Sequence, residues 1–224
     1  MCGINGFNFK DDELILKMSS YTKSRGPDFT DYFKSLNYTV SHNRLAIIDP
    51  KDRSNQPFRF KNLILSFNGE IYNYLELRQK LKIKGHIFST NSDTEVIIKL
   101  FYEYNEESFK LLSGIFALSI YDCDKDKLYL IRDHVGVKPL YYYFNDKNNK
   151  FAYSSLIKPL LLVSGESKLN KDAIKYYANF NRNDLKETFY KNIFKVLPGE
   201  LIIFENKVLK KKNLLTFNFD KKFK

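Results

Sequence analysis

Cysteine is scarce in this 224-residue chain, which contains only Cys2 and Cys123. Two cysteines are too few for a disulfide framework, and a reducing compartment is their natural environment. No apolar run approaches the roughly 20 residues that a membrane-spanning helix needs. The first ten residues also lack the basic start and the apolar stretch of a signal peptide. The sequence therefore predicts a cytoplasmic protein with no membrane partner.

Histidine is also scarce, and the three histidines show no metal-ligand spacing. The chain has neither zinc-finger spacing nor a helix-turn-helix signature. It also lacks the Gly-x-x-x-x-Gly-Lys-Ser/Thr loop that binds nucleotide phosphates. We therefore expect no metal and no cofactor in this chain.

Positive charge is in excess, since 37 lysines and arginines stand against 26 acidic residues and give a net charge of +11. Residues 207–224 contribute +6 of this charge, from seven lysines and one aspartate. A basic segment of this kind is more often a solvated tail or linker than a nucleic-acid groove. We therefore interpret residues 206–224 as a basic tail or linker. Nucleic-acid binding is a distant alternative, and no nucleic-acid partner is expected.

Apolar and charged residues make up 43% and 28% of the chain, a composition typical of a globular protein with a sizeable core. Strand patterns predominate toward both ends and helical patterns in the middle, without regular strand–helix alternation. This order favours an α+β fold with mostly antiparallel sheets. Helices are expected near residues 11–20, 74–84, 93–101 and 172–180, and strands near residues 4–9, 32–49, 63–67, 115–121, 127–132, 140–144, 151–154 and 200–205.

Several polar residues stand at predicted strand boundaries. Asn68 and Gly69 follow the buried strand 63–67, and an Asn-Gly pair readily forms a turn. Arg44 precedes the apolar segment 45–48, which we interpret as a strand, so the usual place of this arginine is the solvent face. Taken alone, these residues are explained by an ordinary hairpin and a surface cation.

Cys2 directly follows the initiator methionine, and its small size allows an aminopeptidase to remove Met1. One residue would then carry both a thiol and a free α-amine, so a nucleophile and a base lie side by side. Their unperturbed pKa values, ~8.5 for the thiol and ~7.7–8.0 for the amine, leave part of the amine free to take the thiol proton near neutral pH. On position alone, an inert residue at a frayed terminus is the simpler interpretation.

The neighbouring motifs change this interpretation, because they occur in one order at one set of spacings. They are Cys2-Gly3-Ile4, Arg25-Gly26-Pro27-Asp28, residues 42–49 (HNRLAIID), 68–73 (NGEIYN), 92–95 (SDTE), 114–117 (GIFA) and 132–141 (RDHVGVKPLY). The ordered set resembles the class II glutamine amidotransferase domain, the N-terminal-nucleophile domain of glutamine-hydrolysing asparagine synthetases. The resemblance covers residues 2–205 and implies a four-layer αββα sandwich of antiparallel sheets.

The resemblance also implies the roles of individual residues. Cys2 matches the nucleophile, and Asn68 with Gly69 matches the oxyanion hole. Arg44 matches the residue that binds the glutamine α-carboxylate, which a guanidinium does with two parallel hydrogen bonds. Asp93 matches the acid that holds the α-ammonium. The remaining matches are Glu70 and the backbone of Leu45, Ala46, Ile47 and Ile48 as pocket walls, and Arg25 as a loop arginine near the nucleophile.

Two positions depart from the family pattern. Ser24 stands where histidine is common, and Asn43 stands where a basic residue or glutamate is common. Neither position is required by the chemistry above, so the departures leave the branch of the family open.

The resemblance implies a glutaminase that releases ammonia and glutamate through a Cys2 thioester. Asparagine synthetases also carry a domain that activates a carboxylate with ATP and Mg, marked by a Ser-Gly-Gly-x-Asp-Ser loop; residues 164–167 are not that loop. We therefore expect L-glutamine and a synthetase domain or subunit as partners, with aspartate or another carboxylate as the ammonia acceptor. The chain is then a fragment, the product of a truncated gene or one subunit of a split enzyme.

Two other function classes remain open. One is a catalytically silent module that binds glutamine or a partner. It is disfavoured by the intact set of Cys2, Arg44, Asn68, Gly69 and Asp93. The other is a different N-terminal-nucleophile amidohydrolase, such as an acylase. The pair of Arg44 and Asp93, suited to a free α-amino acid, disfavours that second class.

Overall fold

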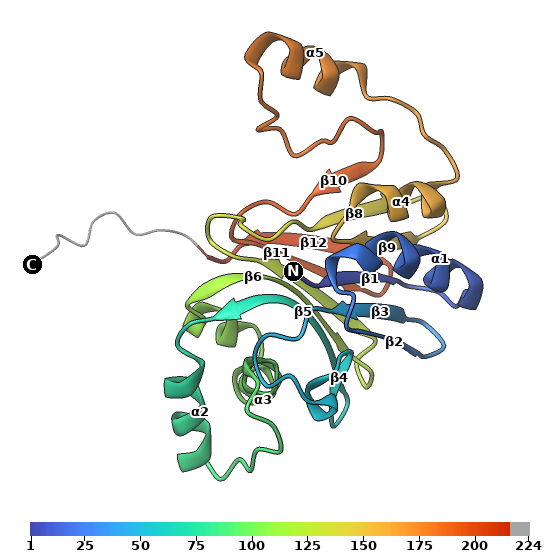
Figure 1. Cartoon of the computed structure of the whole chain (residues 1–224). Helices are drawn as coiled ribbons and strands as arrows, with labels where there is room; N and C mark the ends of the chain where they lie inside the picture. Colours follow the sequence, from blue (N-terminus) through green and yellow to red (C-terminus); the bar gives the residue numbers. More distant parts are fainter. Residues whose placement is uncertain (216–224) are drawn as a thin grey trace, which may run out of the picture.

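The computed structural model describes residues 1–215 as two stacked antiparallel β-sheets with helices on both outer faces (Figure 1). The predicted α+β class and four-layer αββα sandwich are confirmed. Within these residues, no helix is long and apolar enough to cross a membrane. In chain order, the elements are β1 (Gly3–Phe7), α1 (Asp12–Thr22), β2 (Phe29–Lys34), β3 (Thr39–Arg44), β4 (Phe58–Phe60), β5 (Leu63–Ile71), α2 (Tyr74–Ile83), α3 (Asp93–Tyr104), β6 (Gly114–Asp122), β7 (Lys127–Arg132), β8 (Tyr141–Asn145), β9 (Lys150–Ser154), α4 (Ile157–Ser164), α5 (Lys171–Phe180), β10 (Ile193–Lys195), β11 (Glu200–Glu205) and β12 (Val208–Asn213).

The first sheet has the strand order β10-β8-β9-β1-β3-β2, so β1 is an inner strand. β1 pairs with β3 in a register that places Gly3 opposite Asn43 and Ile4 opposite His42. Because this inner strand begins at Gly3, Cys2 is anchored at the end of the sheet and does not belong to a frayed terminus.

The second sheet has the strand order β12-β11-β7-β6-β5-β4. β5 pairs with β6 along its whole length, from Leu63 opposite Asp122 to Ile71 opposite Gly114. On its other side, β4 pairs only with residues 63–65 of β5. Residues 66–71 of β5 therefore have a strand neighbour on one side and an open edge on the other.

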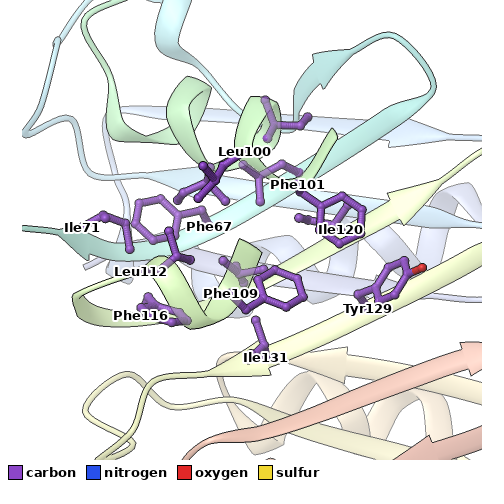
Figure 2. Close-up of a cluster of buried hydrophobic side chains, with 14 of the residues drawn as sticks. Phe67, Ile71, Leu100, Phe101, Phe109, Leu112, Phe116, Ile120, Tyr129 and Ile131 are labelled. Atoms are coloured by element: carbon purple, nitrogen blue, oxygen red, sulfur yellow. The ribbon is translucent and has the colours of Figure 1, made fainter. Parts of the chain in front are cut away.

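Three clusters of buried apolar side chains hold the four layers together. The first lies between the two sheets and includes Ile4 and Leu130. The second joins the second sheet to α2 and α3; Figure 2 shows Phe67 of β5 and Phe101 of α3 within it. The third joins the first sheet to α1 and α4 and includes Leu160. Removal of these surfaces from water is the main stabilising contribution to the sandwich.

A buried network of short polar side chains ties β1 to α1 and β3. Asn5 Nδ2 donates to Thr22 Oγ1 at 2.8 Å, and Thr22 Oγ1 donates to Asn43 Oδ1 at 2.6 Å. Asn43 Nδ2 in turn donates to Ser19 Oγ at 3.0 Å and to Thr30 Oγ1 at 2.9 Å. Since these buried amides are satisfied, the network fixes the strands beside Cys2. Asn43, which departs from the family pattern, therefore has a structural role in this chain.

Asn68 and Gly69 do not form the turn that the sequence predicted. β5 continues through both residues, with Asn68 opposite Ala117 and Gly69 opposite Phe116. Glycine is required here by close strand contact, because a Cβ at this position would lie 2.2 Å from the Ile115 carbonyl oxygen. The Asn-Gly pair thus reflects tight packing of β5 on β6.

The interpretation of residues 206–224 as a tail is corrected for its first part. Val208–Asn213 form β12, which pairs with β11 at the edge of the second sheet. Three consecutive lysines within β12 hide the alternation that would have indicated a strand. The rest of the predicted tail, from residue 216 onward, lies outside the described residues.

We expect replacement of Gly26 by alanine to destabilise the fold strongly. A Cβ at this position would lie 2.1 Å from the Asn43 carbonyl oxygen, so β3 or the preceding loop would have to move. Gly26→Ala should lower the free energy of unfolding by more than about 2 kcal/mol, measured by urea denaturation. Ser24→Ala, at an exposed position two residues away, should change it by less than about 0.5 kcal/mol. Equal stabilities of the two variants would contradict the packing argument.

Candidate active site

Cys2 lies directly before β1 and borders a cavity of about 80 Å³. Its Sγ lies 3.4 Å from the backbone nitrogen of Leu45, at the end of β3. Its backbone N–H donates to Asn68 Oδ1 at 2.9 Å, so Cys2 is held between the first sheet and β5 of the second sheet. Burial raises the pKa of the Cys2 thiol. The nucleophilic thiolate therefore forms only with the help of a base.

The open edge of β5 directs a backbone donor into this cavity. Phe116 N–H donates to Asp133 Oδ2, and the Phe116 carbonyl accepts the Asp133 N–H, so both groups point away from β5. In an antiparallel pair of strands, two residues that lie opposite each other point their N–H groups either both toward the neighbouring strand or both away from it. The β5 residue opposite Phe116 therefore points its N–H away from β6. That residue is Gly69, which lines the cavity. Gly69 N–H therefore faces the same space as the Cys2 thiol.

Side chains satisfy the two neighbouring donors on this edge. Phe67 N–H donates to Gln56 Oε1 at 2.7 Å, and Ile71 N–H donates to Asp93 Oδ2 at 3.1 Å. Residues 67, 69 and 71 alternate along the strand and share one edge. Of these three backbone donors, the one at Gly69 is the donor that faces the cavity.

Asn68 supplies a second donor beside Cys2. Its Oδ1 accepts the Cys2 N–H, which fixes the orientation of the side-chain amide. Its Nδ2 is buried and has no hydrogen-bond partner within residues 1–215. Buried polar atoms without a partner are rare and unfavourable, because they have lost their contacts with water. The amide nitrogen is therefore in place for a hydrogen bond that the protein itself does not provide.

Arg44 ends β3 and lines the cavity, with a buried side chain that organises the loop after it. Its two terminal nitrogens donate four hydrogen bonds, to the carbonyl oxygens of Ile48, Asp49 and Lys51 and to Asn55 Oδ1, at 2.7 to 3.2 Å. All four terminal N–H groups are therefore engaged with the loop that forms one wall of the cavity.

The segment 45–48 is not the strand that the sequence predicted. β3 ends at Arg44, and the Ala46 N–H donates to Asp28 Oδ2 at 2.8 Å. Side chains from Arg44 and Asp28 thus satisfy backbone groups that a strand neighbour would otherwise bind. Of the four predicted wall residues, Leu45, Ile47 and Ile48 line the cavity, whereas Ala46 is held by Asp28.

Asp93 and Glu70 bring negative charge to the cavity. Asp93 is the first residue of α3 and is 4% exposed, and Glu70 lies next to Gly69 on β5. Burial, and then the nearby Glu70 carboxylate, raise the pKa of Asp93 to about 6, although the Ile71 N–H favours its charged form. The Asp93 carboxylate is therefore charged at neutral pH at a cost in stability.

Arg25 lies behind Cys2. Its Nε donates to the Cys2 carbonyl oxygen at 3.0 Å, so it fixes the backbone of Cys2. The structure thus places the predicted loop arginine beside Cys2, and its role in the site stays a prediction.

Sequence reasoning missed several residues of the cavity. Lys138 lies in the quoted motif 132–141, but no feature of that motif assigned it to the site. Gln56 lies in a polar loop without periodicity, so no sequence pattern points to it. The complete set of unpredicted lining residues is Met1, Ser54, Gln56, Phe67, Ser92, Thr94 and Lys138. Among residues 1–215, no cluster of three His, Cys, Asp or Glu side chains could hold a metal ion.

A family model described as a glutamine amidotransferase domain matches residues 1–214. The chain belongs to this family. The match includes every residue of the cavity, so the recognised family and the observed site coincide in one part of the molecule.

Curated relatives of this amidotransferase domain are asparagine synthetases. A putative asparagine synthetase [glutamine-hydrolyzing] 2 of Methanocaldococcus jannaschii is 35% identical over 92% of this chain and 44% of its own length. Asparagine synthetase [glutamine-hydrolyzing] 1 of Bacillus subtilis is 35% identical over 89% of this chain and 33% of its own length. The chain therefore spans less than half the length of these relatives.

Two solved structures share the fold. One, described as the allosteric regulatory enzyme of purine biosynthesis, has a TM-score of 0.70 at 20% identity and covers 94% of this chain and 48% of that chain. The other is glutamine phosphoribosylpyrophosphate amidotransferase from Bacillus subtilis. It has a TM-score of 0.69 at 19% identity, and the match covers 94% of this chain and 49% of that chain. At these identities, the likeness shows the arrangement of sheets and helices in the amidotransferase domain.

The raised pKa of Asp93 predicts a pH-dependent gain in stability for Asp93→Asn. The folded domain binds the Asp93 proton more tightly than the unfolded chain, whose carboxyl has a pKa near 3.8, so this group costs stability as pH rises from about 4 to about 6. An asparagine at position 93 still has a side-chain oxygen that can accept the Ile71 N–H, and it carries no charge. Asp93→Asn should therefore be more stable than the wild type at pH 8, by up to about 3 kcal/mol, and equal to it below pH 4. Urea denaturation at both pH values measures this difference, and a wild type that is the more stable at pH 8 would contradict it.

Proposed function

We propose that this domain hydrolyses the side-chain amide of L-glutamine to glutamate and ammonia, with Cys2 as the nucleophile. The observation that carries the proposal is the side-chain amide of Asn68. Its Nδ2 is buried at the Cys2 cavity and has no partner within residues 1–215. An amide oxygen that gains negative charge during attack by sulfur would accept this hydrogen bond and that of Gly69 N–H.

The base in this proposal is the α-amine of Cys2, exposed by removal of Met1. A base is needed because burial raises the pKa of the thiol. Burial also lowers the pKa of the terminal amine that Met1 carries, and Arg25 and Lys138 lower it further. The same surroundings would act on an amine at Cys2 and favour its neutral, basic form.

The reaction balances with these groups and one water molecule. The Cys2 sulfur attacks the amide carbon while the thiol proton passes to the α-amine, and the oxyanion accepts hydrogen bonds from Asn68 and Gly69. The C–N bond then breaks, the amine returns its proton to the leaving nitrogen, and ammonia departs from a thioester. Water, deprotonated by the amine, attacks the thioester, so that the C–S bond breaks and glutamate leaves with the thiol restored.

The charged groups of the cavity would bind the amino-acid end of glutamine. We propose that Asp93 pairs with the α-ammonium and that Glu70 adds to the negative potential there. Arg44 would attract the α-carboxylate by its charge while its terminal N–H groups hold the loop 48–55. This differs from the two parallel hydrogen bonds expected from the sequence, because those donors are already engaged. The bonded loop would place Ile47 and Ile48, which line the cavity, against the substrate.

We propose a synthetase domain or subunit as the consumer of the ammonia. It would activate aspartate or another carboxylate with ATP and Mg, and this chain would contribute no cofactor to that step. The support comes from the curated relatives, which are named as asparagine synthetases and are more than twice as long as the part matched here. We place the reaction in the cytoplasm, where a reducing environment keeps the free Cys2 thiol available.

A glutaminase assay with two site variants tests the proposed function. Cys2→Ala should abolish turnover and still bind glutamine, because Arg44 and Asp93 are unchanged. Asn68→Ala should lower kcat by about 10²- to 10³-fold with a smaller effect on KM, since its donor acts on the oxyanion. Mass spectrometry of the active protein should show that Met1 is absent.

Three outcomes would contradict the proposal. Glutamine binding without turnover by the chain lacking Met1 would indicate a silent module. Hydrolysis of acylated amines in preference to glutamine would indicate another amidohydrolase. Full activity with Met1 retained would exclude the Cys2 amine as the base.

Variants of Arg44 test the assignment of the α-carboxylate. Arg44→Ala and Arg44→Lys should each raise KM for glutamine by at least about tenfold, because lysine cannot make the four loop hydrogen bonds. Arg53, an exposed arginine of the same loop paired with Asp49, provides the control. Arg53→Lys should leave KM within about twofold of the wild type. An unchanged KM in both Arg44 variants would remove Arg44 from the substrate site.

A further inference from the structure

The two halves of the proposed reaction site come from different sheets. Cys2 precedes β1 in the first sheet, whereas Asn68 and Gly69 lie on β5 in the second sheet. Attack and oxyanion stabilisation both depend on the distance between these sheets at the cavity. A shift of about 1 Å in such a geometry can slow a reaction by about 10²-fold.

His42 forms a hydrogen bond between the two sheets at this point. It lies on β3, opposite Ile4 of β1, and its side chain is fully buried. Its Nε2 lies 3.0 Å from the carbonyl oxygen of Phe67 on β5. That carbonyl belongs to the peptide group that leads directly into Asn68. The contact therefore holds the backbone immediately before the two oxyanion donors.

Phe67 is held on both of its backbone groups. Its carbonyl faces His42, and its N–H donates to Gln56 Oε1 at 2.7 Å. Both contacts lie on the open edge of β5, beyond the three residues that pair with β4. Side chains thus replace the missing strand neighbour at the residue next to Asn68.

The contact with the Phe67 carbonyl sets the tautomer of the His42 ring, and burial keeps the ring neutral. A carbonyl oxygen only accepts, so Nε2 carries the hydrogen and donates it. Nδ1 is buried, and it has no partner within residues 1–215. Burial, aided by the charge of Arg44, lowers the pKa of His42 to about 4. The ring is therefore a neutral hydrogen-bond donor throughout the neutral pH range.

We propose that His42 is a positioning residue, which holds Asn68 and Gly69 of the second sheet opposite Cys2 of the first by its hydrogen bond to the Phe67 carbonyl. This inference rests on the proposed glutaminase reaction. In this role, His42 affects the rate at which glutamine acylates Cys2, and it makes no direct contact with glutamine.

The experiment compares two reactions of the same thiol in the chain lacking Met1. Glutamine hydrolysis needs the oxyanion donors, whereas alkylation of Cys2 by iodoacetamide forms no oxyanion. His42→Leu, which removes the donor, should lower kcat for glutamine by about 10- to 100-fold. The alkylation rate and KM should stay within about threefold of the wild type. His42→Gln, which can place an N–H near the position of Nε2, should restore kcat to within about threefold.

Tyr153→Phe is the matched control for a general loss of sheet–sheet contact. Tyr153 of β9 is also fully buried, and its hydroxyl donates to Ser119 Oγ of β6 at 2.8 Å, away from the cavity. Its loss removes this inter-sheet hydrogen bond and the hydrogen bond to the Tyr38 hydroxyl, and neither partner lies on β5. It should leave the ratio of hydrolysis to alkylation unchanged, whatever its effect on the melting temperature.

A double-mutant cycle decides whether His42 acts through Asn68. In an Asn68→Ala background, His42→Leu should lower kcat by a smaller factor than in the wild type, because one of the two donors that it positions is already gone. An equal loss in both backgrounds, or a loss of alkylation in parallel with hydrolysis, would overturn the positioning role. Full hydrolysis by His42→Leu would overturn it while the proposed function stands. A wild-type chain without glutaminase activity would overturn both.

Discussion

The incomplete pairing of β5 is the constraint on which the site depends. Backbone N–H groups inside a protein need partners, and a strand normally obtains them from its neighbours. β4 pairs with residues 63–65 only, so side chains must bind the rest of that edge. Gln56 and Asp93 bind two of the three N–H groups there, and the one at Gly69 faces the cavity. A β4 longer by a few residues would have paired this edge and closed the site.

Two groups at the cavity are unfavourable for the fold by itself. Asn68 leaves a buried amide nitrogen without a partner within residues 1–215, and Asp93 carries a charge in a largely buried position. Each of these costs would fall in contact with a molecule that offers an amide oxygen and an ammonium group. Groups that destabilise the fold are thus concentrated at the cavity, as is typical of functional sites.

The sequence predicted those features that leave a periodic or ordered signal. The apolar spacing in 93–101 indicated α3, and the ordered motifs around Cys2, Arg44 and Asn68 led to the correct sandwich. Features set by tertiary contacts were missed. Asn68-Gly69 reads locally as a turn, but the close approach of β6 keeps it in a strand. The segment 45–48 has strand-like composition, yet side chains from Arg44 and Asp28 satisfy its backbone. The helix α4 and the short strands β4 and β10 carried no clear pattern.

The lysines of β12 acquire a meaning that composition alone did not suggest. An edge strand presents unpaired backbone groups, and a second molecule can add to them as a further strand. β12 lies at one edge of the second sheet and carries Lys210, Lys211 and Lys212, all exposed. Two such edges repel each other, so these charges oppose edge-to-edge aggregation of the domain. Part of the positive charge that first pointed toward nucleic acid thus keeps individual molecules apart.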